Sequence, residues 1–303
     1  MENLSLLDVS IRNQAKTIGS YLIRSGDRNI LIDCGPESQF NNLEQQLKKL
    51  SLSPQDITDV LLTHIHLDHA GAAWRFAELG ANIYLHPIGQ IHMIDPSRFL
   101  ASAKMIYEDT MDIWGDLKPI APNKLRVVED NQVLKIGNLS IEALFTPGHA
   151  KHHISWMIDD HIFSGDICGC RFPNGGPVVA PTPPPDLDFI LWEKSIKIIQ
   201  QKKPKALCLT HYGIFTDVDA HLAKLREDLV FIEKFSKQLA DKKIDLASIG
   251  QNTPPEIENA LLAQTKVGEL YDFYQVMAPT WMNVQGMIHY WNKKKYKEAQ
   301  KKG

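Results

Sequence analysis

Four short apolar segments of this chain each end at side chains that can bind a metal ion, and this repeated pattern constrains the fold more than any other feature. The segments and the side chains that follow them are Asp59–Thr63 before His64, His66, Asp68 and His69; Leu139–Phe145 before His149; His161–Ser164 before Asp166; and Lys205–Thr210 before His211. Each segment resembles a short buried strand, with a glycine or a turn beside the candidate ligand. Separate strands would therefore carry their ligands to one edge of a sheet.

Residues 61–71, LLTHIHLDHAG, place three histidines and one aspartate within six residues. In an extended segment, residues two apart point the same way, so His64 and His66 would face one space, and Asp68 keeps that parity. His69 breaks it where the chain should bend into a helix. We therefore expect His64 and His66 to serve one ion, with Asp68 and His69 serving a second ion beside it. Imidazole and carboxylate suit zinc, iron or manganese.

The remaining segments indicate an α/β or α+β protein built from packed layers. Further strands are expected at Tyr21–Arg24, Asn29–Asp33, Ala81–Leu85, Leu125–Val128, Gln132–Ile136 and His153–Ile158, and helices at Gln39–Leu50, Ala70–Leu79 and Leu187–Gln201. Asp186 is the expected N-cap of the last of these helices. Helical spacing dominates from about Asp217, so we divide the chain into a catalytic domain, 1–216, and a helical C-terminal extension that packs on it, 217–303.

Composition argues against several classes of protein. Apolar residues make up 44% of the 303 residues, and a net charge of −3 gives no general attraction to nucleic acid or to an anionic membrane. No apolar run approaches the roughly 20 residues that span a bilayer, and the N-terminus is not expected to be a signal peptide. Four cysteines are too few for a disulfide scaffold, so reduced thiols and a cytoplasmic location are expected.

The motifs THIHLDHAG, TPGH, FSGD and LTHYG, in this order and spacing, resemble those of the metallo-β-lactamase superfamily over roughly Tyr21 to Gly213. The resemblance implies a four-layer αβ/βα sandwich. It also implies ligand roles, which are His64, His66 and His149 for one metal, Asp68, His69 and His211 for the other, and Asp166 as a bridge between them. Lactam-cleaving members commonly have a cysteine where Asp166 stands, so the aspartate is more similar to the glyoxalase II, lactonase and phosphodiesterase branches.

Such a site would bind two divalent ions, with zinc favoured and iron or manganese as alternatives. Two ions can share one water and make it a hydroxide near neutral pH. Asp68 would orient this hydroxide and later move a proton. We therefore expect a hydrolase of a small ester, thioester or lactone. The alternatives are a mononuclear-iron oxygenase similar to persulfide dioxygenases, and a phosphodiesterase. An electron-transferring module ranks lowest, because no phosphate-cradling glycine loop follows a strand in residues 217–303.

Several other residues are open to two interpretations. Asp33 and Asp59 could accept an imidazole N–H or act only in turns and caps, and Cys168 and Cys170 could be soft ligands or small buried residues. The weaker substrate-binding candidates are Lys151, Tyr212 and His86, which could equally be a solvated lysine, a packed tyrosine and a loop residue. The apolar pocket wall is expected to include Met93, Phe99, Met105, Tyr107, Trp114 and Phe172. This wall favours a small-molecule substrate with an apolar body. The C-terminal helices could also support a homodimer.

Overall fold

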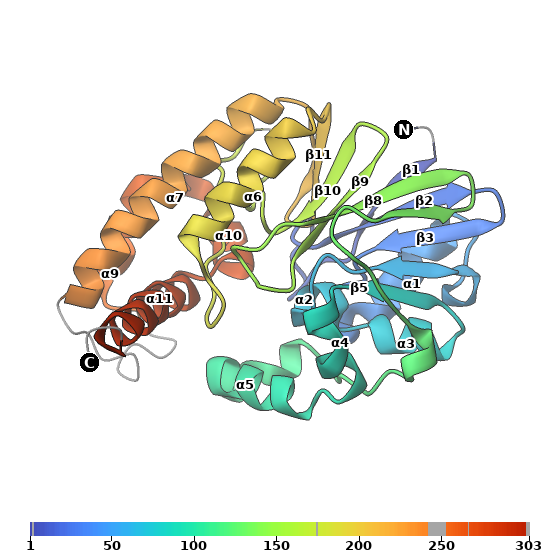
Figure 1. Ribbon diagram of the computed structural model, residues 1–303, viewed down its shortest axis with the longest axis horizontal. Helices are drawn as coiled ribbons and strands as arrows, with labels where there is room; N and C mark the ends of the chain where they lie inside the picture. Colours follow the sequence, from blue (N-terminus) through green and yellow to red (C-terminus); the bar gives the residue numbers. More distant parts are fainter. Residues whose placement is uncertain (2, 174, 242–252, 266, 301–303) are drawn as a thin grey trace.

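The computed structural model describes all residues except 2, 174, 242–252, 266 and 301–303, and it contains two six-stranded sheets (Figure 1). The first sheet has the order β1 (Leu4–Asp8), β2 (Gly19–Ser25), β3 (Arg28–Ile32), β4 (Asp59–Leu61), β5 (Asn82–Leu85) and β6 (Leu125–Val127). The second has the order β12 (Gly213–Phe215), β11 (Ala206–Leu209), β10 (His161–Gly165), β9 (Ile154–Ile158), β8 (Leu139–Phe145) and β7 (Val133–Ile136). Strands β3 to β6 are parallel, as are β10 and β11, while the other neighbouring strands are antiparallel.

Successive residues of the central strands face different hydrophobic clusters. Tyr21 and Ile23 of β2 pack between the sheets with Trp156 and Phe163 of the second sheet, whereas Leu22 faces the opposite side. The same alternation puts Cys208 of β11 between the sheets and its two neighbours against helices. Because both faces of these strands are buried, the strands have continuous apolar sequences.

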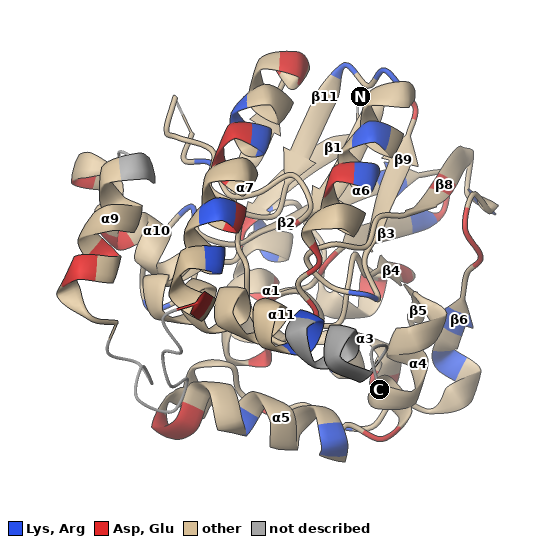
Figure 2. Ribbon diagram, turned by 60° about the vertical axis from the view of Figure 1, so that its left-hand side comes forward, with Lys and Arg blue, Asp and Glu red and all other residues tan. Residues whose placement is uncertain are grey.

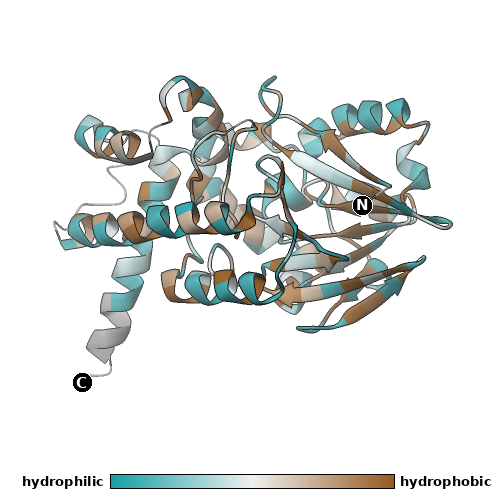
Figure 3. Cartoon of the chain, turned by 90° about the horizontal axis from the view of Figure 1, so that it is seen from above, coloured by the Kyte–Doolittle hydropathy of each residue, from teal (hydrophilic) through white to brown (hydrophobic). Residues whose placement is uncertain are grey.

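Helices cover the outer face of each sheet, which confirms the expected four-layer sandwich (Figures 1 and 3). Over the first sheet lie α1 (Phe40–Lys49), α2 (Leu67–Ala70), α3 (Ala73–Glu78), α4 (Pro87–Ile94), α5 (Ser97–Tyr107) and α10 (Tyr271–Met277). Over the second lie α6 (Phe189–Gln201) and α7 (Val218–Asp241), and α9 (Pro255–Thr265) and α11 (Thr280–Gln300) pack on α7 farther from the strands. Short 3₁₀ turns occupy Glu37–Gln39, Pro54–Asp56, Glu108–Ile113, Pro122–Lys124 and Gly268–Leu270. Among the described helices, none has the length and apolarity needed to cross a membrane.

Two of the expected helices differ from those observed. The helix expected over Ala70–Leu79 is split into α2 and α3, and the break follows Ala70, where the backbone of Gly71 lies against that of Pro36 and Glu37. The expected N-cap was also wrong. Asp188, not Asp186, caps α6, because its Oδ1 accepts the backbone N–H of Leu191 at 3.0 Å. The edge strands β1 and β12 were not expected at all.

The C-terminal helices share a hydrophobic cluster with the second sheet. Leu222, Leu225 and Leu229 of α7 pack with Leu207 and Leu209 of β11. The division of the chain at residue 216 remains a prediction, but the helices beyond it cover the outer face of this sheet (Figure 1).

Candidate metal centre

The carboxyl ends of several strands meet at one edge of the sandwich, and the candidate ligands follow these ends. Strands β8, β10 and β11 run in the same direction, so His149, Asp166 and His211, which follow them, emerge at the same edge. The segment after β4 joins them from the first sheet. Its Thr63 carbonyl accepts the backbone N–H of Ile154 at 2.7 Å, which ties this segment to β9.

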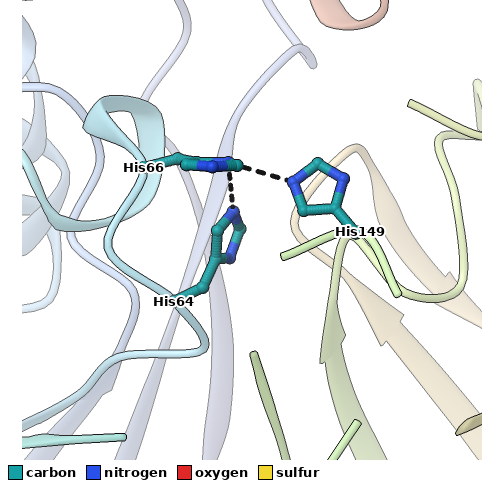
Figure 4. Close-up of side chains that lie close together, drawn as sticks. All are labelled: His64, His66 and His149. Atoms are coloured by element: carbon teal, nitrogen blue, oxygen red, sulfur yellow. Dashed lines mark hydrogen bonds between the residues drawn. The ribbon is translucent and has the colours of Figure 1, made fainter. Parts of the chain in front are cut away.

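All seven predicted ligands lie in one cluster of potential metal-binding atoms. The cluster consists of three overlapping groups: His64, His66 and His149; His64, His69 and Asp166; and Asp68, His69 and His211. Within each group the ligand atoms lie within 4.8 Å of one another. Figure 4 shows the first group, in which Nδ1 of His66 is 2.9 Å from Nε2 of His64 and 3.0 Å from Nε2 of His149.

The separations in the second half of the cluster fit ligands around a shared cation. Oδ1 of Asp166 lies 3.2 Å from Nε2 of His69 and 3.3 Å from Nε2 of His211, and Oδ2 of Asp68 lies 3.3 Å from the latter. Two ligands at about 2.05 Å from a tetrahedral ion would be about 3.3 Å apart. These two histidine nitrogens and Asp166 Oδ1 are nevertheless buried without a hydrogen-bond partner in the described structure. Such orphaned polar atoms, aimed at a common point, fit a metal ion.

Hydrogen bonds fix the orientation of most of these imidazoles. Nδ1 of His149 donates to the carbonyl of Pro181 at 2.9 Å, and Nδ1 of His211 donates to the carbonyl of Thr17 at 2.8 Å. Nδ1 of His69 donates to the Asp33 carboxylate at 2.7 Å. Because a carbonyl or carboxylate oxygen can only accept, these rings carry their hydrogen on Nδ1. Their Nε2 lone pairs are therefore free for a metal.

Charge within the cluster favours a cation near the aspartates. Burial by itself raises the pKa of Asp68 and lowers that of His69, but their mutual attraction and the nearby charges more than offset burial. The pKa of Asp68 therefore lies well below its ordinary value and that of His69 well above. Burial also acts on Asp166, yet the charges of His69 and His211 leave its pKa lowered. Positive charge is thus stabilised at the orphaned atoms.

The other half of the cluster consists of neutral imidazoles. Burial, reinforced by neighbouring histidines, lowers the pKa of His64 well below its ordinary value and brings that of His66 to about 4. Burial also lowers the pKa of His149. A neutral imidazole is the form that binds metal, so these three side chains are ready to coordinate.

The local geometry of Asp68 differs from the expectation that it continues a strand. Strand β4 ends at Leu61, His66 is the extended N-cap of α2, and Asp68 lies in the first turn of that helix. Asp68 nevertheless groups with His69 and His211. Asp68 and His69 are neighbours in α2, and both side chains extend from this short helix to the cluster. The side chain of Asp68 is 19% exposed, and Asp68 lines a cavity.

This cavity, of about 420 Å³, opens onto the cluster at His66, Asp68, His149 and Asp166. Of the expected wall residues, Phe99, Tyr107 and Trp114 line it. The others were wrong, since Met93 is buried in the core, Met105 is 77% exposed, and Phe172 packs on Phe273. The loop 181–186 and residues 275–283 complete the wall.

The weaker candidates have structural partners. Lys151 lines the cavity but pairs with Asp186. Tyr212 packs in the hydrophobic core and is not among the described residues that line the cavity. His86 caps α4 by accepting the N–H of Ile88 at 3.1 Å, and burial lowers its pKa to about 4.

The two aspartates and two cysteines that had alternative interpretations are also distinguished by their contacts. Asp33 contacts His69, whereas Asp59 pairs with Arg28 at 2.6 Å. Cys168 and Cys170 are buried, and neither belongs to the metal-binding groups found in the described part of the chain.

Two histidines next to the cluster were given no role from the sequence. Nε2 of His153 accepts the backbone N–H of Asp166 at 3.2 Å, while Nδ1 of His153 lies 2.9 Å from the Thr146 hydroxyl. His152 lines the cavity, with its ring 5.5 Å from that of His66. The sequence did hold one indication of a role for His153. This residue directly precedes β9, and β9 pairs with β10, which Asp166 follows.

Two stacked sheets covered by helices, with a histidine–aspartate cluster at one edge, are the architecture of a metallo-hydrolase. The sequence profile of the Metallo-beta-lactamase superfamily matches residues 18–211, and the chain belongs to that superfamily. It is 30% identical over 221 residues to the Metallo-beta-lactamase fold-containing protein ST1585 of Sulfurisphaera tokodaii, which covers 69% of this chain and 78% of the relative. The metallo-beta-lactamase family protein TTHA1429 of Thermus thermophilus has the same fold, with a TM-score of 0.65 over 97% of this chain and 94% of that one at 18% identity.

More distant relatives bear functional names. The Probable polyketide biosynthesis zinc-dependent hydrolase BaeB of Bacillus velezensis is 26% identical, and the match covers 50% of this chain and 59% of that protein. The Atrochrysone carboxyl ACP thioesterase of Aspergillus fumigatus is 28% identical over 50% of this chain and 40% of its own length.

Proposed function

We propose that this protein is a binuclear metal-dependent hydrolase of an ester, thioester or lactone. His64, His66 and His149 would hold one divalent ion, and Asp68, His69 and His211 the other, with Asp166 between them. The observation that carries this proposal is a set of buried, unpartnered atoms, in which Oδ1 of Asp166 lies 3.2 Å from Nε2 of His69 and 3.3 Å from Nε2 of His211. Zinc is favoured because of the many imidazole ligands.

When bound, such ions would lower the pKa of a water to supply a nucleophile and would polarise the substrate carbonyl. The protein supplies the remaining functions. Asp68 lines the cavity and is held ionised, so its carboxylate can orient the attacking water and take its proton. Asp33 and the carbonyls of Thr17 and Pro181 keep the imidazoles aligned. The apolar cavity wall excludes bulk water from the reacting carbonyl.

The thioesterase and hydrolase names of two relatives support acyl transfer to water as the reaction. The names of these two relatives give no comparable support to a phosphodiesterase activity. The mononuclear-iron oxygenase stays an alternative outcome of the metal measurement.

Elemental analysis of the purified protein, followed by assays with thioesters, lactones and phosphodiesters, tests this proposal. We expect two divalent ions per chain in the wild type and at least one fewer in His66→Ala, while the fold measured by circular dichroism is unchanged. His92→Ala is the matched control, because His92 lines the same cavity outside the cluster. One iron per chain with thiol-dependent oxygen consumption, or full metal retention in His66→Ala, would contradict the proposal.

A further inference from the structure

The cavity beside the cluster has walls of a specific chemistry. Aromatic and aliphatic side chains from several parts of the chain form most of its surface, among them Phe99, Tyr107, Trp114, Trp281 and Met282. Its volume of about 420 Å³ lies within the range of about 300–1,000 Å³ that is typical of sites for small organic ligands. A substrate that fills this space must therefore bury an apolar body next to the metal centre.

Several polar side chains of the wall already have partners within the protein. Lys151 is paired with Asp186. Gln275 donates to the Thr280 hydroxyl at 2.6 Å and accepts the backbone N–H of the same residue at 3.1 Å. Asn283 accepts the N–H of Thr182 at 2.8 Å and donates to the carbonyl of Ala278 at 3.2 Å. These groups hold the wall together and have little capacity left for a ligand.

Arg12 and Arg98 differ from these polar residues because neither has an ion-pair partner in the described part of the chain. Both line the cavity and both are exposed. Arg98 lies in the first turn of α5, and Figure 2 shows separate basic positions along that helix. Since the whole chain carries a net charge of −3, two uncompensated guanidinium groups at one cavity are not a consequence of a basic composition.

Tyr107 lies between the metal centre and one of these cations, Arg12, in the sense that the charges of both act on it. Burial raises the pKa of its hydroxyl, the charges of Asp68 and Asp166 raise it further, and the charge of Arg12 opposes them. The tyrosine is thus within electrostatic reach of both the cluster and Arg12. All of these residues line the same cavity, so one ligand in it could contact the ring, Arg12 and the edge of the cluster.

We propose, building on the hydrolase function above, that the substrate is an amphiphilic acyl ester or thioester whose apolar part packs among the aromatic side chains and whose anionic group is bound by Arg12 and Arg98. Guanidinium groups bind carboxylate or phosphate through paired N–H donors. In the reaction, water adds its oxygen to the acyl carbon, the bond from that carbon to the ester oxygen or thioester sulfur breaks, and the departing group takes up a proton.

Binding of substrate-like amphiphiles tests this inference without turnover. The probes are octyl phosphate and nonanoate, with 1-octanol as the neutral analogue and methyl phosphate as the analogue without the chain. Titration of the metal-loaded protein can be followed by the fluorescence of Trp114 and Trp281, which line the cavity, or by calorimetry. We expect at least one anionic amphiphile to bind about tenfold or more tightly than both 1-octanol and methyl phosphate. The anion that binds more tightly shows whether the site prefers a phosphate or a carboxylate group.

The double variant Arg12→Gln/Arg98→Gln should weaken binding of the preferred anion by about tenfold or more. The control Lys194→Gln/Lys224→Gln removes the same charge from exposed positions on α6 and α7 and should bind like the wild type. Equal affinity for 1-octanol and both anions, or wild-type affinity in the arginine variant, would overturn the inference. Hydrolysis of a short neutral thioester is measured separately on the wild type, so failure of the hydrolase function is distinguished from failure of this substrate assignment.

Discussion

Asp33 is the residue on which the orientation of His69 depends. Besides accepting from His69, its carboxylate accepts the backbone N–H and the hydroxyl of Thr63 at 2.7 and 2.8 Å, and the hydroxyl of Thr210 at 3.1 Å. One buried carboxylate thus connects the ends of β3, β4 and β11. Loss of the Asp33 carboxylate should therefore change the orientation of His69 at the metal centre, in addition to any effect on the stability of the fold.

We predict that Asp33→Asn weakens binding of one metal ion by about 10–100-fold, because the amide accepts less strongly and no longer fixes the imidazole. Competition with a chelating dye would measure the affinity. Asp59→Asn is the matched control, since Asp59 is equally buried but pairs with Arg28. If both variants lose metal to the same degree, the effect comes from general destabilisation and not from His69.

Asp228 gives a prediction about pH. It is buried on α7 and accepts the backbone N–H of Ala180 at 2.8 Å, and burial raises its pKa from 3.8 to about 7 despite that hydrogen bond. The folded protein therefore keeps this proton over a range in which the unfolded chain has released it. The resulting stability is present at low pH and is lost as the pH rises towards 7.

Asp228→Asn keeps an acceptor for Ala180 but removes the charge. The variant should gain stability relative to the wild type as the pH rises from about 5 to about 8, by up to about 3 kcal/mol. Urea unfolding at the two pH values would measure this difference. A difference that does not change with pH would show that the carboxyl group is ionised or hydrated already at the lower value.

At the scale of elements, helix α11 forms part of the cavity wall by packing closely on the loop 181–186. Gly286 makes this approach feasible, because a Cβ at this position would overlap the carbonyl oxygen of Thr182. The backbones of the helix and the loop can therefore meet directly. The cavity depends on this contact, since the loop also holds His149 through the carbonyl of Pro181.

Gly286→Ala should destabilise the protein by about 1–3 kcal/mol, although alanine ordinarily favours a helix by about 1 kcal/mol over glycine. Denaturant unfolding would measure the change. Asn292→Ala, at an exposed position of the same helix, should be neutral or slightly stabilising. Stabilisation by Gly286→Ala would mean that the helix and the loop are not in close contact in solution.

The sequence allowed prediction of which histidines and aspartates gather in the cluster, but not of most of the groups that support them. The candidate ligands follow the mostly apolar strands β4, β8, β10 and β11, so simple apolar runs located them. By contrast, Thr17 and Pro181 support histidines through backbone carbonyls, which every residue has. The cavity wall depended on the rotational phase of α5, where Tyr107 points inward and Met105 outward. The sequence of α5 has apolar residues on several sides of the helix, so it does not indicate which side faces the cavity.

At the scale of the whole molecule, we predict that a chain ending at Thr216 does not fold as an independent monomer. It would lack α7 and α11, so that only α6 would remain over the outer face of the second sheet and the cluster around Leu207 and Leu209 would lose part of its cover. Size-exclusion chromatography with light scattering should show aggregation, and circular dichroism should show no cooperative unfolding. A monomeric, cooperatively folded truncated chain would instead establish residues 1–216 as an autonomous domain.

The cavity draws its wall from residues 275–283, whereas the superfamily profile ends at residue 211. Part of the cavity wall is therefore supplied by a stretch of the polypeptide outside the segment that carries the candidate ligands. Evolution could exchange the helical end of the chain and redirect the catalyst to new molecules while every metal ligand stayed in place. We accordingly expect relatives that differ in the C-terminal segment to differ in the substrates they accept, even where they share the same candidate ligands.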